Sequence, residues 1–118
     1  MYNYSTIPAS GVHFIEVCSL SDIPSGERIF FEIGNNPVVV INIADVLYAI
    51  ADKCSHDNGP VGEGDLDGQE IICPRHGARF DIKTGRAIRL PAVEDIPSYP
   101  VQIENGKVRI GIPAKLLS

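Results

Sequence analysis

The sequence predicts an all-β domain, and two observations carry that prediction. Eleven glycines and nine prolines separate short apolar runs that recur about every ten residues, which is the spacing of strands joined by turns. Many of these runs are rich in β-branched residues, which fit strands better than helices. At 118 residues the chain has the size of one domain, and we expect residues 1–118 to form it. The expected strands are Val12–Cys18, Arg28–Ile33, Val38–Ile43, Val46–Ile50, Glu70–Cys73, Ala78–Ile82, Tyr99–Glu104 and Lys107–Ile112.

The clearest local signal is a hairpin made by the last two of these strands. Tyr99, Val101 and Ile103 alternate with polar residues, and the alternation resumes in the strand that follows. Between the two strands lies Asn105-Gly106, a dipeptide that favours a two-residue turn with positive φ. The sequence therefore predicts an antiparallel pair here.

Two further turns are expected, at Ala44-Asp45 and at Lys83-Thr84-Gly85. A short helix over Asp45–Asp52 is the alternative near the first of them. The β-branched run Val38–Ile43 before it favours strands on both sides of a turn instead.

Composition and charge exclude several classes of function. The formal net charge is −5, from 15 acidic and 10 basic residues, whereas binding to nucleic acid requires a basic face. No apolar run reaches the length of a membrane span, and the opening residues MYNYSTIPAS lack the basic and apolar regions of a secretory signal. The three cysteines are a small and odd number, unlike the even set of a disulfide framework. We expect a cytoplasmic protein with no nucleic-acid or membrane partner.

The stretch Lys53–Leu66 differs from the rest of the chain. It contains Gly59, Pro60, Gly62 and Gly64 and few large apolar residues, so we expect a loop. Loops of this length within a compact domain are usually functional.

The loop carries Cys54-Ser55-His56, and Cys73-Pro74-Arg75-His76 follows a predicted strand further on. In extended chain, side chains two residues apart point the same way, and around a turn those three apart converge. Pro74 prevents a helix through the second motif, and Gly77 lets the backbone approach whatever lies between the loops. Each loop thus offers one thiolate and one imidazole, which suits a Rieske centre, in which two histidines replace two cysteines on one iron of a [2Fe–2S] cluster.

Two alternatives remain for the same residues. A structural zinc site could use two cysteines and two histidines, although zinc fingers commonly pair Cys with Cys and His with His. A nucleophilic Cys–His couple needs only one residue of each type and leaves the second pair unexplained. The remaining cysteine, Cys18, ends an apolar strand and is expected to be a buried small hydrophobe. No chemistry is assigned to His13.

The segment CSHDNGPVGEGDLDGQEIICPRHGARFDIKTGRAIRLPA resembles the cluster-binding segment of Rieske-type ferredoxins. The CxH–x16–CxxH spacing, the ICPxHGxxFD context, the TG turn and Leu90-Pro91 all match the family. The resemblance implies stacked antiparallel β-sheets with a cluster-binding subdomain formed by two loops, over about residues 52–92. It also implies one [2Fe–2S] cluster per chain, with Cys54 and Cys73 on one iron and His56 and His76 on the other. Residues expected around the cluster are Gly59, Pro74, Arg75, Gly77, Ala78, Phe80 and Pro91.

Departures from the family pattern indicate a low reduction potential. High-potential Rieske proteins carry an extra disulfide where this chain has Gly59 and Arg75. They also place a Ser and a Tyr, whose hydroxyls bond to the cluster sulfurs, where this chain has Ala78 and Phe80. Losing hydroxyl donors disfavours the reduced form, so we expect a potential of about −150 mV, the low end of the Rieske range.

The resemblance implies a soluble carrier of single electrons, passing them from an NAD(P)H-dependent flavoprotein reductase to a terminal oxygenase through transient contacts. Asp57, Arg75 and Arg79 flank the expected ligands and are candidates for docking a partner. The chain is not itself expected to be an oxygenase, because the mononuclear iron of that enzyme needs two further histidines and only His13 remains. The alternative is the small subunit of an assimilatory NAD(P)H nitrite reductase, partnered with its large subunit. A zinc-holding interaction module is a third reading.

Overall fold

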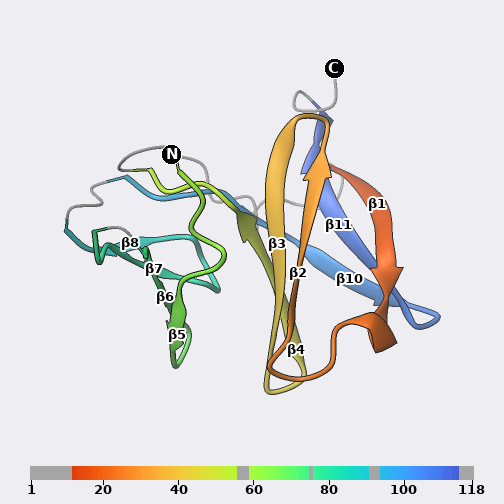
Figure 1. Ribbon diagram of the computed structural model, residues 1–118. Helices are drawn as coiled ribbons and strands as arrows, with labels where there is room; N and C mark the ends of the chain where they lie inside the picture. The colour runs from red at the N-terminus through yellow and green to blue at the C-terminus, as the bar shows by residue number, and fades with distance from the viewer. Residues whose placement is uncertain (1–11, 56–58, 75, 91–93, 115–118) are drawn as a thin grey trace.

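The computed structural model describes residues 12–55, 59–74, 76–90 and 94–114. Within these ranges the chain is built almost wholly of β-strands (Figure 1), as expected from the sequence. A single turn of 3₁₀ helix, Leu20–Asp22, follows the first strand. The strands are β1 (Val12–Ser19), β2 (Arg28–Ile33), β3 (Asn36–Ile43), β4 (Val46–Ala51), β5 (Asp65–Asp67), β6 (Glu70–Ile72), β7 (Arg79–Asp81), β8 (Ala87–Arg89), β9 (Ser98–Tyr99), β10 (Val101–Glu104) and β11 (Lys107–Pro113).

The strands form three antiparallel sheets. The first, which we call the scaffold sheet, has three strands in the order β1-β11-β10. The second, which we call the middle sheet, has four strands in the order β2-β3-β4-β9. A second four-stranded sheet, of order β5-β6-β7-β8, contains the strands on either side of the second motif. Figure 1 shows the β2-β3-β4 strands between the other two sheets. The middle sheet therefore supports both halves of the molecule.

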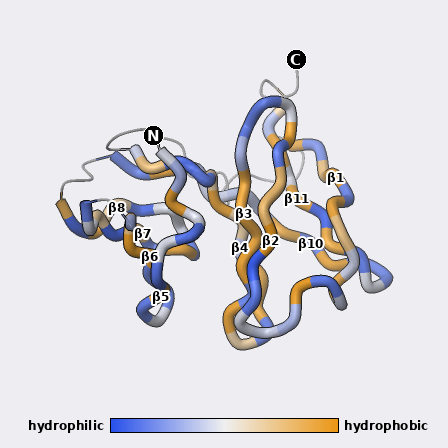
Figure 2. The backbone as a smooth tube through the Cα atoms, in the orientation of Figure 1, coloured by the Kyte–Doolittle hydropathy of each residue, from blue (hydrophilic) through white to orange (hydrophobic). Residues whose placement is uncertain are grey.

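Strand β3 explains how one sheet serves two neighbours. Its side chains alternate, so Val38 and Val40 lie in a core shared with β1 and β11, which we call the scaffold core. Val39 and Ile41 lie in a second core with Cys54 and Cys73, which we call the loop core. All four side chains have an exposed fraction of 0%. This double burial accounts for the unbroken apolar run in the sequence, which is visible as the orange centre of Figure 2.

Three hairpins are closed by two-residue turns in which both residues have positive φ. These turns are Gly34-Asn35 (φ 53° and 68°), Ala44-Asp45 (52° and 69°) and Asn105-Gly106 (53° and 74°). The last two confirm turns expected from the sequence, and such turns match the twist of the flanking strands. The alternative of a helix over Asp45–Asp52 is wrong, because Val46–Ala51 is a strand paired with β3.

One expected strand needs correction. The run Tyr99–Glu104 is not one strand, because it divides at Pro100 into β9, which pairs with β4, and β10, which pairs with β11. Proline has no N–H for a ladder, and its carbonyl instead accepts a hydrogen bond from Gly111 N–H at 2.8 Å.

Strands β5 and β8 are not predicted by the sequence. Leu66, which was expected in a loop, lies in β5 and is paired with Ile71. Both missed strands have only three residues, Asp-Leu-Asp and Ala-Ile-Arg, which is too short for an alternating pattern to stand out. The ends of the other expected strands lie within two residues of the expected positions. No helix in the described ranges is long and apolar enough to cross a membrane.

Candidate metal centre

The first loop, residues 52–64, begins where β4 ends and brings Cys54 into the protein interior. Cys54 has an exposed fraction of 0%, and its backbone N–H donates a hydrogen bond of 2.7 Å to the carbonyl of Gly59. The carboxylate of Asp52 accepts hydrogen bonds from the N–H groups of Val61 at 3.0 Å and Gly62 at 2.6 Å. A single aspartate thus organises the far end of the loop.

The second loop, residues 73–78, joins β6 to β7. Cys73 N–H donates to the carbonyl of Ala78 at 2.7 Å, and Gly77 N–H donates back to the carbonyl of Cys73 at 3.0 Å. Gly77 has φ +73°, a conformation that favours glycine. Each loop is therefore closed by a bond from a cysteine N–H to the carbonyl five residues ahead.

The two loops bring their cysteines into the same core. Cys73 has an exposed fraction of 1%, and Ala78 and Phe80 beside it are completely buried. All three lie with Cys54 in the loop core. His76, by contrast, is exposed, so the described ligand candidates form a buried sulfur side and an accessible imidazole.

These residues fit a [2Fe–2S] cluster with mixed ligands. Thiolates are the ligands expected for one iron and imidazoles for the other, and the burial of Cys54 and Cys73 protects the sulfur side from water. The described residues by themselves contain no group of three His, Cys, Asp or Glu side chains that could hold a metal ion. His56, the fourth expected ligand, lies outside the described residues.

A third segment lies against the first loop. The hydroxyl of Ser55, next to Cys54, donates a hydrogen bond of 2.5 Å to the carbonyl of Glu94. Asp95 accepts a bond of 2.8 Å from Ala87 N–H, which ties the same segment to β8. Pro91, which the sequence placed near the cluster, lies outside the described residues.

Two glycines in the first loop leave no room for a side chain. Gly62 is covered by Phe30, since a Cβ on it would come within 2.6 Å of the ring carbon Cε2. Gly64 lies against the backbone carbonyl of Ile72 in β6. In the sequence these glycines indicate only a loop, whereas the structure shows that close packing requires them.

The expected docking residues have different surroundings. Arg79 forms ion pairs with Asp67 at 2.8 Å and Glu70 at 3.2 Å, and its hydrogen bonds to these carboxylates raise its pKa. The cation is therefore compensated within its own sheet rather than simply solvated. Asp57 and Arg75 lie outside the described residues.

Cys18 and His13 lie in β1, in the scaffold sheet away from both loops. His13 is exposed. Cys18 is partly buried against the scaffold core, and burial, followed by the charge of Asp22, raises the pKa of its thiol. Cys18 is therefore an apolar contact at the margin of the scaffold core and is less buried than the sequence predicts.

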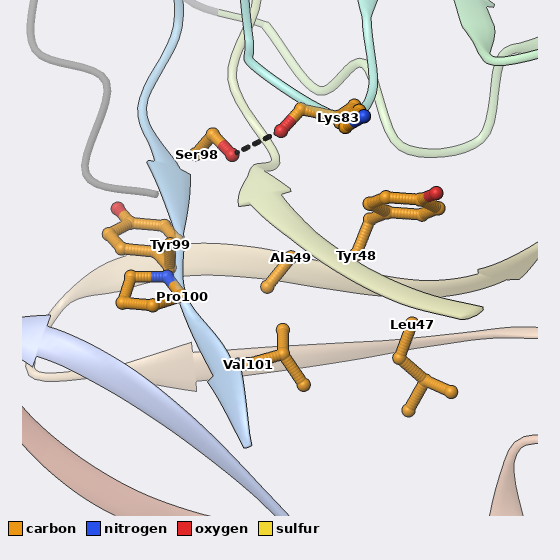
Figure 3. A pocket seen from close by; sticks show the side chains of 8 residues that line it. All are labelled: Leu47, Tyr48, Ala49, Lys83, Ser98, Tyr99, Pro100 and Val101. Carbon is orange, nitrogen blue, oxygen red and sulfur yellow. Dashed lines mark hydrogen bonds between the residues drawn. The ribbon is translucent and has the colours of Figure 1, made fainter. Parts of the chain in front are cut away.

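A cavity of about 350 Å³ lies between the middle sheet and the turn that joins β7 to β8 (Figure 3). Its lining includes Leu47, Tyr48 and Val101, and none of the expected cluster ligands. Across its upper edge, Ser98 Oγ donates to the carbonyl of Lys83 at 3.1 Å. The bond joins the turn between β7 and β8 to β9.

Comparison with known proteins agrees with this geometry. The family model of the Rieske [2Fe–2S] domain matches residues 13–100. The chain is 41% identical over 101 residues to the 3-phenylpropionate/cinnamic acid dioxygenase ferredoxin subunit of Escherichia coli K12, covering 84% of this chain and 93% of that one.

Solved structures give the same result. The ferredoxin of Sphingomonas yanoikuyae B1 superposes with a TM-score of 0.77 at 32% identity, covering 86% of this chain and 100% of that one. The ferredoxin of carbazole 1,9a-dioxygenase from Nocardioides aromaticivorans IC177 superposes with a TM-score of 0.77 at 29% identity, over 85% and 97% of the two chains. A chain from the complex of reduced oxygenase and oxidized ferredoxin in carbazole 1,9a-dioxygenase gives 0.76 at 31% identity, over 83% and 92%.

Proposed function

Because this chain belongs to the Rieske [2Fe–2S] domain family, we propose that Cys54, His56, Cys73 and His76 hold its cluster. The chain is an electron carrier rather than an enzyme, as its relatives named above are ferredoxin subunits of dioxygenase systems. We place the carrier function in a single domain of residues 1–118, with the ligands in the segment of about residues 52–92.

The observation that supports this assignment best is the matched pair of loops. Both are closed by a cysteine N–H bond, to Gly59 and to Ala78, and both deliver their cysteine to the loop core. When bound, a [2Fe–2S] cluster supplies a one-electron redox couple. The buried cysteines exclude water from the sulfur side, and the exposed His76 presents its ring to an approaching protein.

The partners follow from the relatives. We propose that electrons arrive from an NAD(P)H-dependent flavoprotein reductase and leave to a terminal oxygenase, in the cytoplasm. The relatives are subunits of dioxygenase systems, which favours the oxygenase over a nitrite reductase as the acceptor. A zinc-holding module is disfavoured by the same comparison.

The docking face is proposed to lie around His76 and the end of β8. Leu90 has an exposed fraction of 72% and Ile88 one of 47%. Asp95 is bonded to Ala87 at the start of β8, and the neighbouring Glu94 is bonded to Ser55 of the first loop. Asp57, Arg75 and Arg79 border the ligands in the sequence and remain candidates for charged contacts with the partner.

Electron paramagnetic resonance and potentiometry of the purified protein test the proposal. We expect a rhombic signal of the reduced form with the low average g value of mixed Cys/His ligation, and a midpoint near the low end of the Rieske range. His76→Ala is expected to abolish the signal, whereas His13→Ala, which removes another exposed histidine, leaves it unchanged. A colourless protein with one zinc per chain, or a His76→Ala variant with the wild-type signal, would contradict the proposal.

A further inference from the structure

The first loop is held from outside by an edge strand of the middle sheet. Arg28 lies in β2, and its Nη1 donates hydrogen bonds of 2.6 Å to the carbonyl of Gly62 and 2.8 Å to that of Gly64. These contacts span 34 and 36 residues of sequence. One cationic group therefore joins the middle sheet to two carbonyls of the first loop, which carries Cys54.

Phe30 acts on the same segment. Alternation in β2 places it on the same face as Arg28, while Ile29 and Phe31 pack on the scaffold core. The Phe30 ring lies close enough over Gly62 to exclude a Cβ there. Two side chains from one strand face thus cover the turn between Val61 and Gly64.

Asp52 completes the arrangement from inside the loop. Its Oδ1 accepts the N–H groups of Val61 and Gly62, while Arg28 binds the carbonyls of Gly62 and Gly64. Asp52 is itself anchored, because its N–H donates to the carbonyl of Pro37 at 2.9 Å. Two carbonyls and two N–H groups of this turn are therefore bound by side chains of opposite charge, Arg28 and Asp52.

We propose that Arg28 is a positioning residue for the first cluster loop, holding the turn Val61–Gly64 so that Cys54 stays seated in the loop core. The link between turn and ligand is Val61, which is completely buried in the same core as Cys54 and Cys73. If the turn moves, Val61 leaves that core and the packing that orients Cys54 is lost. Charge-assisted hydrogen bonds to buried carbonyls are strong enough for this role.

Two readouts test the inference, and only the first depends on the proposed ligands of the cluster. The first readout is the rate of cluster release into a chelator, followed by visible absorbance, below the unfolding temperature. The second is amide hydrogen exchange at Val61, Gly62 and Gly64, with Ile110 in β11, which is buried in the scaffold core, as the internal reference. If the chain held no cluster, the proposed function would fail at the first readout, while the second would still report on Arg28.

Arg28→Met removes the cation and keeps an apolar stem of similar reach. We expect cluster release and loop exchange to accelerate roughly tenfold to a hundredfold, with exchange at Ile110 unchanged. Arg86→Met is the matched control, since Arg86 is exposed before β8 and its loss is expected to change neither rate. Arg28→Lys keeps a cation without the planar fork, so its rates should fall between wild type and Arg28→Met.

Two results would overturn the proposal. One is an Arg28→Met protein that releases its cluster and exchanges its loop amides at the rate of Arg86→Met. The other is an increase at Ile110 equal to that in the loop, which would mean a general loss of stability rather than a positioning role. Where Arg28→Met does not accumulate as a folded protein, Arg28→Lys carries the test, and wild-type exchange at Gly62 and Gly64 in that variant would overturn the proposal.

Discussion

Gly64, at the end of the first loop, lies directly against the backbone carbonyl of Ile72, the last residue of β6. Ile72 immediately precedes Cys73, so this contact joins the two cysteine-bearing loops at their bases. Gly64→Ala would place a methyl group where the carbonyl oxygen lies, and one of the two backbones must move. We expect a loss of about 3 kcal/mol in the free energy of unfolding, together with a lower iron content, measured by denaturant unfolding and iron assay.

Gly68→Ala is the control for this change. Gly68 lies in the β5–β6 turn at φ +61°, where a Cβ would meet nothing within 4 Å, so only backbone strain is added there, about 1 kcal/mol. Equal losses in the two variants would show that the Gly64–Ile72 contact does not constrain the loops.

The reduction potential is expected to depend on the missing hydroxyls at Ala78 and Phe80. Both side chains are fully buried in the loop core with Cys54 and Cys73. Phe80→Tyr and Ala78→Ser each add a donor that can stabilise the reduced form, and about 1 kcal/mol per bond corresponds to roughly 40 mV in a one-electron couple. Potentiometric titration should show an upward shift in each variant, whereas Phe80→Leu should show none. A downward shift in the Tyr and Ser variants would refute the explanation for a low potential.

Partner docking is expected to depend on Leu90. Leu90→Asp places a charge on the most exposed large apolar side chain of the described residues. The KM of the terminal oxygenase for the ferredoxin should rise roughly tenfold, the effect of losing a contact worth about 1.4 kcal/mol, with the midpoint potential unchanged. Ile103→Asp, at an exposed position of β10 in the scaffold sheet, should leave this KM unchanged. Equal effects of the two substitutions would place the docking face elsewhere.

The raised pKa of Cys18 gives a pH-dependent prediction. Burial and the Asp22 carboxylate favour the protonated thiol in the folded state, so the stabilisation is fully present below the pKa of the unfolded thiol. It is lost as the pH rises through the higher folded pKa. At pH 8, iodoacetamide should label Cys18 more slowly than it labels a small free thiol, as followed by mass spectrometry.

Asp22→Asn should accelerate this labelling, because it removes the charge that opposes thiolate formation. Asp65→Asn, in β5, is the control and should leave the labelling rate of Cys18 unchanged. A slower reaction in Asp22→Asn would show that the carboxylate does not act on the Cys18 thiol.

Much of the fold could be predicted because the strands of the middle and scaffold sheets carry strong local signals. The bounds of β2 were predicted to the residue, and the Asn105-Gly106 turn lies where expected. Strands β5 and β8 could not be predicted, because Asp65–Asp67 and Ala87–Arg89 become strands only by pairing with β6 and β7. A local pattern cannot reveal a strand whose cause is its neighbour.

The same limit applies to the candidate site. The ligand candidates stand out in the sequence through two short motifs, and the described part of the chain brings Cys54 and Cys73 into one core. The support of the loop by Arg28 had no such signal, because the residues it binds are 34 and 36 positions away. The ion pairing of Arg79, which the sequence offers only as a docking candidate, had no local signal either, since its partner Asp67 lies 12 residues earlier.

The alternation of β3 between two cores has a consequence for the divergence of such proteins. Val39 and Ile41 contribute to the redox half of the molecule, while Val38 and Val40 contribute only to the supporting half. A substitution on one face leaves the packing of the opposite face in place. The two faces of β3 can therefore vary independently in sequence. Related proteins can change the residues around the electron-carrying loops without changing the packing of the scaffold core.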